Sequence, residues 1–186
     1  MTGAGLAALI WLSAAPTPEG TITSLPAWNR YAAAAAWSFA RNGYGASGGL
    51  ERALWSPRPW LHAIAGADLT YLRFYPFEPV AGLTSDAGSA TATAAGGLLL
   101  GHRRGRLQAG AAVFVGLQRF ARDDRLDRPD LQIQDRVEGS EWTTRSGWRL
   151  LLHGRATERF WLLLGAESTF RDIQVSHVSL GISFVP

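Results

Sequence analysis

The amino-acid sequence predicts an all-β fold, an eight-stranded antiparallel up-and-down transmembrane β-barrel with short periplasmic turns. Residues 107–117, LQAGAAVFVGL, alternate between an apolar row and a row of small, amide and aromatic residues, which is the two-residue period of a strand. About ten residues is the length that a tilted strand needs to cross a bilayer, whereas strands of soluble proteins cluster near five or six. The same pattern recurs along the chain, and tight connections alternate with longer ones.

The composition agrees with this class. A chain of 186 residues is one domain, and 47% hydrophobic with 18% charged residues excludes a disordered chain. The mean hydropathy is close to zero, too low for a bundle of membrane helices but typical of strands that present only alternate residues to lipid. There is no Cys, and all 18 basic residues are Arg, scattered among 15 acids. Nucleic-acid binding is therefore not expected.

The N-terminal region resembles an export signal. Residues 1–15 hold an apolar stretch from Leu6 to Leu12 and then the small residues Ser13, Ala14 and Ala15, a suitable cleavage tripeptide. The alternative is a short N-terminal helix on a soluble domain. We expect a signal peptide over 1–15, a periplasmic segment over 16–29 and the barrel domain over 30–186.

The first four strands are expected between residue 31 and residue 101. The alanine run at 32–36 favours a helix by propensity, but Tyr31, Trp37 and Phe39 share one parity and therefore one strand face. The other three strands are expected at 43–55, 60–75 and 89–101. Between them lie a tight turn, SPRP at 56–59, and a loop at 76–88.

The last four strands follow the turn HRRG at 102–105. They are expected at 107–120, 141–154, 160–170 and after residue 172. The stretch 121–139, with six acids and four Arg, is interpreted as a solvated loop. Its acids could suggest Ca²⁺, but arginines are interleaved and no calcium-loop spacing occurs, so no metal is expected; the acids are Asp123, Asp124, Asp127, Asp130 and Asp135.

Aromatic residues gather near both ends of the predicted strands, as in the interfacial girdles of membrane barrels. The girdle at the tight-turn end is assigned Trp55, Trp60, Phe160 and Phe184. The girdle at the loop end is assigned Tyr71, Phe120, Trp142 and Phe170.

The second face of the strands distinguishes a barrel in lipid from a soluble, lipocalin-like ligand-binding barrel. It carries many small residues and a few charges of both signs, which suits a narrow, filled interior better than a water-exposed surface. Buried charges need partners, so we predict an ion-pair network of Arg145, Arg149 and Glu167, with His153 and His177 on the same face.

One pair of residues suggests an enzyme. His177 and Ser179 have the His-x-Ser spacing of outer-membrane lipid A deacylases, in which His is the general base for a Ser nucleophile. No acidic residue that could orient the His follows the pair, and both side chains are predicted to point into the barrel. Ordinary interior hydrogen bonding is the favoured interpretation, and no catalytic residue is assigned.

The second half of the chain resembles a known family. The segment 96–120, the motif Arg128-Pro129-Asp130, the motif Gly139-Ser140-Glu141-Trp142 and Phe170-Arg171-Asp172 are similar to the cellulose biosynthesis protein BcsS family. The resemblance covers 96–184, and 31–75 more loosely. It implies an outer-membrane barrel with an accessory role in cellulose export, and no catalytic residues come with it.

Together these observations predict a non-enzymatic outer-membrane barrel, an accessory protein of an exopolysaccharide system. The expected partners are outer-membrane lipid and the cellulose synthase machinery or a glucan chain. No cofactor is expected. The alternatives are a lipid-modifying enzyme that uses His177 and Ser179, and the soluble ligand-binding barrel.

Overall fold

The computed structural model describes residues 28–39, 42–75, 82–128, 133–170 and 172–186. The predicted signal peptide, and the periplasmic segment as far as residue 27, lie outside the described residues. Eight strands follow one another in the chain: β1 (Asn29–Ser38), β2 (Gly43–Arg58), β3 (Leu61–Phe74), β4 (Leu83–Leu100), β5 (Leu107–Arg128), β6 (Ile133–Arg155), β7 (Phe160–Thr169) and β8 (Asp172–Phe184).

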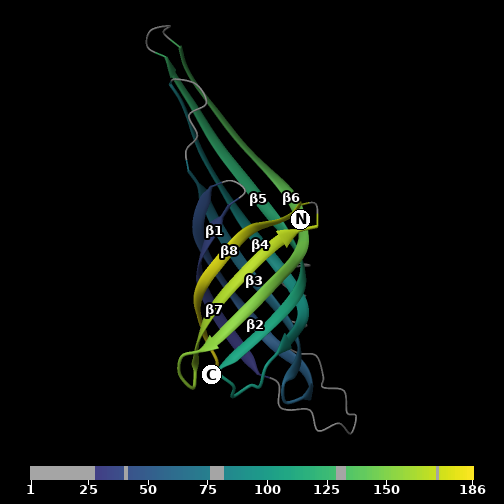
Figure 1. Cartoon of the computed structure of the whole chain (residues 1–186). Helices are drawn as coiled ribbons and strands as arrows, with labels where there is room; N and C mark the ends of the chain where they lie inside the picture. The colour runs from purple at the N-terminus through teal and green to yellow at the C-terminus, as the bar shows by residue number, and fades with distance from the viewer. Residues whose placement is uncertain (1–27, 40–41, 76–81, 129–132, 171) are drawn as a thin grey trace.

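Each strand pairs antiparallel with the next, and β8 pairs with β1, so the sheet closes into a barrel (Figure 1). The closure removes the sheet edges, and it lets every backbone group of the wall find a partner within the sheet. The predicted eight-stranded antiparallel barrel is thereby confirmed. In the described ranges there is no helix long and apolar enough to span a membrane.

The two faces of the wall have opposite character. On β5 the side chain of Val113 is 59% exposed, whereas that of its neighbour Phe114 is 3% exposed. The register carries this alternation around the ring, because Val113 pairs with Gly96 on one side and Trp148 on the other. The outer face of the barrel is therefore a belt of exposed apolar side chains, which is the reverse of a soluble barrel.

The interior, or lumen, is closed by apolar side chains toward both ends. Toward the tight turns, one cluster packs Leu151 against four buried residues: Trp28, Ala53, Ile64 and Leu99. Toward the opposite end, a second cluster holds Ala36, Leu72 and Phe74, with Ala87 and Phe120 against them. An eight-stranded barrel is just wide enough for side chains to fill it, as they do here.

Three strands continue beyond the barrel. β4, β5 and β6 have 18, 22 and 23 residues, and in Figure 1 β5 and β6 rise well above the other strands. We call the part above the belt the extension; it comprises 83–90 of β4, 119–128 of β5 and 133–142 of β6. The extension corrects the prediction of a solvated loop over 121–139, and β4 likewise begins six residues before Ser89. The sequence pattern does not reveal these strand segments, because the alternating residues here are mostly charged and give no apolar signal.

The tight turns lie at the other end of the barrel, where the C-terminus also lies (Figure 1). The first differs in detail from its prediction, since β2 runs through Pro57 to Arg58. The register with β3 shifts between Ala53 and Arg58, and such irregularities are where a strand tolerates Pro.

Most of the predicted girdle residues lie on the outer face. Trp55, Trp60, Phe160, Tyr71, Trp142 and Phe170 are all exposed. Phe184 is half-buried against Phe160, with 5.3 Å between ring centroids. Phe120 was assigned wrongly: it shares the inward parity of Phe114 and packs on Phe74 inside the barrel mouth, with ring centroids 5.9 Å apart. Its height suits a girdle, but its face does not.

Candidate functional site

A group of charged side chains lies inside the lumen, between the two apolar clusters. Arg149 on β6 reaches across the lumen to Asp68 on β3, with 2.7 Å between Nη1 and Oδ2, and also pairs with Glu167 on the neighbouring strand β7. Nε2 of His177 lies 3.1 Å from Oε2 of Glu167. Thr93 donates its hydroxyl to Asp68 at 2.7 Å. Each charged side chain of this group therefore has a partner of opposite charge or a hydrogen-bonding partner. Such pairing is needed because an unpaired charge is costly in a low-dielectric interior.

A second charged pair lies nearer the tight turns. Arg30 is 2% exposed and pairs with Glu51 at 3.1 Å, and it also donates to the side-chain oxygen of Gln108. Its guanidinium carbon lies 4.7 Å from the ring centroid of Trp28 and 5.1 Å from that of Trp161. Two aromatic faces thus supplement the single carboxylate that balances this buried charge.

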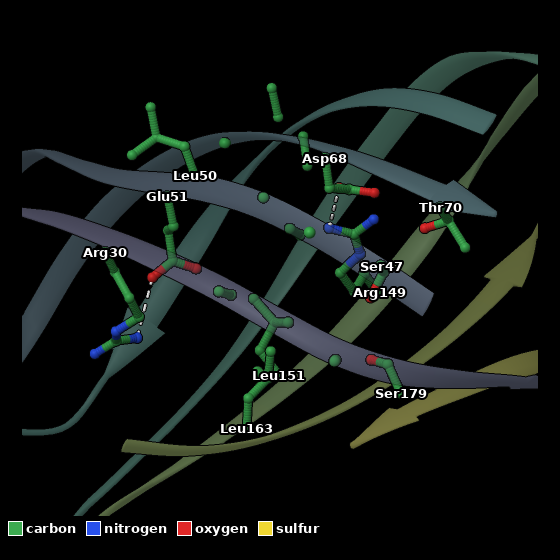
Figure 2. Close-up of a pocket in the computed structure, with 18 of the residues that line it drawn as sticks. Arg30, Ser47, Leu50, Glu51, Asp68, Thr70, Arg149, Leu151, Leu163 and Ser179 are labelled. Carbon is green, nitrogen blue, oxygen red and sulfur yellow. Dashed lines mark hydrogen bonds and ion pairs between the residues drawn. The ribbon is translucent and has the colours of Figure 1, made fainter. Parts of the chain in front are cut away.

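A cavity of about 90 Å³ separates these two charged groups (Figure 2). Figure 2 shows Arg30 and Glu51 at one side of it, and Asp68 and Arg149 at the other. The volume admits a few water molecules, and the apolar clusters lie beyond it on both sides. The lumen therefore contains a small cavity between its two charged groups.

The structure brings together only some of the residues that the sequence singled out. Arg149, Glu167 and His177 are in mutual contact, as described above. Arg145 lies over the same ring as Arg149, with its guanidinium carbon 6.0 Å from the ring centroid of Phe114, and it donates a hydrogen bond to Ser176. His153 is buried nearer the tight turns, and both its ring nitrogens are without a hydrogen-bond partner among the described residues.

Sequence reasoning missed Asp68, Arg30 and Glu51 as members of the interior network. Asp68 has inward parity on β3, and Arg30 and Glu51 are register partners on β1 and β2. Parity alone places all three inside. Their partners could not be named, because contacts across the lumen depend on how the barrel closes.

His177 and Ser179 both line the lumen cavity, as predicted. No acid follows the pair in the sequence, but Glu167, which precedes it on the adjacent strand, contacts the ring of His177. The arrangement nevertheless lies inside the wall, behind the belt of apolar side chains that would face a lipid substrate. A catalyst for lipid needs its nucleophile within reach of the scissile bond, and here the wall separates them.

The extension carries the other candidate site, an open groove of about 840 Å³ on its outer face. Its floor is a row of small residues that are register partners on three strands, Gly88, Ala121 and Ser140. Asp86, Asp123 and Glu138 form the next row outward, again as register partners. The hydrogen-bonding groups of these rows face water, in contrast to the belt below.

Arginines compensate the acidic row. Arg73 pairs with Asp86 at 2.9 Å, and Arg136 pairs with Asp123 at 2.9 Å and with Glu138 at 2.7 Å. Hydrogen bonds from Arg136 and then Arg125 lower the pKa of Asp123 to about 2. The three carboxylates would otherwise repel one another across the strands, so these pairs hold the extension together.

A closed antiparallel barrel with an apolar outer belt, a filled polar lumen and aromatic girdles defines an outer-membrane β-barrel. A search of solved structures finds a similar fold in a major outer membrane protein from Thermus thermophilus, with 11% sequence identity, a TM-score of 0.60 and coverage of 87% of this chain and 100% of that one. Ail, the attachment invasion locus protein of Yersinia pestis, gives 12% identity and a TM-score of 0.49 over 86% of this chain and 97% of its own. At such identities the likeness is one of fold. No protein-family model and no curated protein matches the chain.

Proposed function

We propose that this protein is a non-enzymatic outer-membrane anchor, which presents the extension as a binding surface in a cellulose or related exopolysaccharide system. The observation that carries the proposal is the continuation of β4, β5 and β6 beyond the barrel into a paired, solvent-exposed sheet. A barrel that served only as a wall would need strands no longer than the membrane is thick. By the general topology of these barrels, the end opposite the tight turns faces the outside of the cell.

The lumen supports a role without transport or catalysis. Its charges are paired with one another, and apolar clusters lie at both sides of the cavity. Reconstituted into planar bilayers, the protein should show no stable conductance. A steady single-channel current from the folded, full-length chain would contradict this part of the proposal.

The exopolysaccharide assignment rests on the resemblance of residues 96–184 to the BcsS family, and the groove is compatible with it. A glucan presents hydroxyl groups that both donate and accept hydrogen bonds. The rows of carboxylates, guanidinium groups and Ser140 around the groove offer both kinds of partner. The groove is also wide enough to take an extended ligand, since it crosses three adjacent strands.

A truncation tests the proposal. Residues 122–139 can be replaced by Asn-Gly, a two-residue hairpin turn that joins the register partners Ala121 and Ser140. We expect this variant to fold into membranes, to lose binding to cellulose, and to fail to restore cellulose secretion in a strain that lacks the gene. Undiminished binding and secretion by the truncated chain would overturn the proposal.

Two bulky substitutions localise the contact. Ala121→Trp fills the floor of the groove, whereas Val137→Trp places the same side chain on the opposite face of β6, at an exposed position that does not line the groove. We expect only Ala121→Trp to impair glucan binding. Equal loss by both variants would show that the effect is one of stability and not of the groove.

A further inference from the structure

The end of the barrel that carries the tight turns is strongly basic. In the sequence the turn at 102–106, HRRGR, suggests ordinary turn polarity with lipid phosphate contact as the alternative, and the fold brings further arginines to the same rim. The rim holds six arginines, which we call the collar: Arg58, Arg103, Arg104, Arg106, Arg155 and Arg159. Glu158 is the one acid on the same turns.

The collar carries six positive charges against the single negative charge of Glu158. Among the described residues, none of its six guanidinium groups forms an ion pair with a carboxylate. Arg155 donates instead to two backbone oxygens, that of Thr157 at 3.0 Å and that of Arg104 at 2.7 Å. Arg58 lies over the ring of Trp60 at 5.6 Å. By contrast, four arginines of the lumen and of the extension are paired with acids: Arg30, Arg73, Arg136 and Arg149.

Backbone contacts hold the collar in place. The N–H of Arg155 donates to the carbonyl of Arg106 at 2.8 Å, and the N–H of Val185 donates to that of Arg159 at 2.9 Å. Together with the side-chain bond from Arg155 to Arg104, these contacts tie the β4–β5 turn, the β6–β7 turn and the end of β8 to one another. The like charges are therefore confined, which raises the electrostatic potential at this rim.

A pocket of about 650 Å³ opens between these turns at the mouth of the lumen. Four arginines and one acid line it, and Trp28 and Arg30 also contribute; the charged residues of the turns are Arg103, Arg104, Arg155, Arg159 and Glu158. Trp28 and Arg30 are 4% and 2% exposed, yet Nε1 of Trp28 and Nε of Arg30 have no acceptor among the described residues. Both nitrogens are shielded from the pocket by the side chains around them, so a ligand in the pocket first meets the guanidinium groups of the four arginines.

We propose that this pocket is a binding site for a phosphate group. Phosphate is the anion that suits the site, because its oxygens accept several hydrogen bonds and guanidinium groups bind it in a bidentate manner. Two sources supply that chemistry, the headgroup of a phospholipid in the adjacent leaflet and a soluble phosphate compound. The lipid source is reasonable because tight turns keep the collar within a few residues of the girdle, at the depth of the headgroups.

The test uses the full chain folded in a neutral detergent. Short-chain phosphatidylglycerol and inorganic phosphate are titrated separately, with short-chain phosphatidylcholine as the lipid of no net charge. The readout is the NMR resonance of the Trp28 indole N–H, assigned by its loss in Trp28→Phe. We expect saturable binding and a shift of this resonance, because the side chain of Trp28 lines the pocket.

The variants separate the pocket from charge in general. Arg103→Gln combined with Arg159→Gln should weaken binding by roughly tenfold for each arginine removed, the effect of losing a charged hydrogen bond. Arg155 is left intact because it ties the turns together. Arg122→Gln with Arg125→Gln is the matched control, since it removes the same charge from the opposite end of the molecule.

Each outcome decides the proposal. Binding of phosphatidylglycerol that inorganic phosphate does not displace supports a lipid headgroup, and displacement at millimolar phosphate supports a soluble source. Absence of binding by both probes overturns the proposal. So does binding that the control variant weakens as much as the pocket variant, or that leaves the Trp28 resonance unmoved.

Discussion

Arg149 on β6 and Asp68 on β3 meet across the lumen at 2.7 Å, although their strands are not neighbours in the sheet. The contact exists only because the sheet is closed. It joins opposite walls of the barrel through one guanidinium, which also binds Glu167. Backbone hydrogen bonds join neighbouring strands of the wall, and the guanidinium of Arg149 adds a side-chain link across the lumen.

Removal of the guanidinium should be costly. Arg149→Met leaves Asp68 and Glu167 as buried carboxylates without their main counter-charge, and we expect a loss of about 3–5 kcal/mol in the free energy of unfolding. Urea-induced unfolding of the protein in lipid vesicles measures this value. Arg119→Gln is the control, since Arg119 is exposed and forms no ion pair with a described residue.

A neutral triple variant sharpens the same prediction. Asp68→Asn, Arg149→Met and Glu167→Gln together remove all three charges. Neither carboxylate that contacts Arg149 then remains without its counter-charge. The triple variant should therefore be more stable than Arg149→Met alone. A triple variant less stable than the single one would show that packing, and not charge balance, governs this site.

The apolar belt predicts a position-dependent cost for a charge on the outer face. Val113 lies near the middle of the 107–117 segment and is 59% exposed, so it faces the lipid. Val113→Arg should destabilise the barrel by about 2–4 kcal/mol, the cost of arginine near the bilayer midplane. Ala121→Arg lies on the same face of β5 but on the extension, where we expect little change. Equal effects at the two positions in vesicle unfolding experiments would contradict the membrane placement of β5.

Gly147 illustrates how tightly the lumen is packed. A Cβ at this position would overlap the backbone oxygen of Ser168 and lie 2.9 Å from Cζ of Phe114. Phe114 is 3% exposed and lies beneath Arg149, whose guanidinium carbon is 5.7 Å from its ring centroid. The added methyl group of Gly147→Ala must displace either the wall or this ring. We expect the free energy of unfolding to fall by about 1–3 kcal/mol.

Gly154 is the matched control on the same strand. An added Cβ there meets nothing within 4 Å, so Gly154→Ala should leave the unfolding transition nearly unchanged. A destabilisation as large as that of Gly147→Ala would attribute the effect to glycine itself and not to the packing against Phe114.

The wall could be predicted from the sequence because alternation is a local property. The faces of 107–117, 160–167 and 177–184 follow from parity, and parity also places Arg149, Glu167 and His177 inside. Phe120 shows the limit of reasoning from position along a strand. Its height suits a girdle, but its parity places it in the lumen.

The extension and the collar could not be predicted in the same way. At Asp123 and Arg125 the alternating residues are all charged, and a run of charges resembles a loop unless its cross-strand partners are known. The collar gathers Arg58, Arg104 and Arg159 from three separate turns, and only the closure of the barrel brings those turns to one rim. Both sites therefore depend on contacts between segments that are distant in the sequence.

The extension should loosen in acid. The ionised form of Asp123 is favoured in the folded extension, because hydrogen bonds from Arg136 and Arg125 lower its pKa from 3.8 to about 2. A carboxyl group with a lowered pKa contributes stability that is complete above its ordinary pKa of 3.8 and is lost as the pH falls toward about 2. Amide hydrogen exchange of β5 and β6 above the girdle, corrected for intrinsic rates, should increase across this interval, while exchange in the barrel wall stays unchanged.

In Asp123→Asn the same amides should exchange faster at neutral pH and lose most of this pH dependence, because the titrating group is gone. A pH profile of the variant that matches the unmodified chain would show that Asp123 does not hold the extension together.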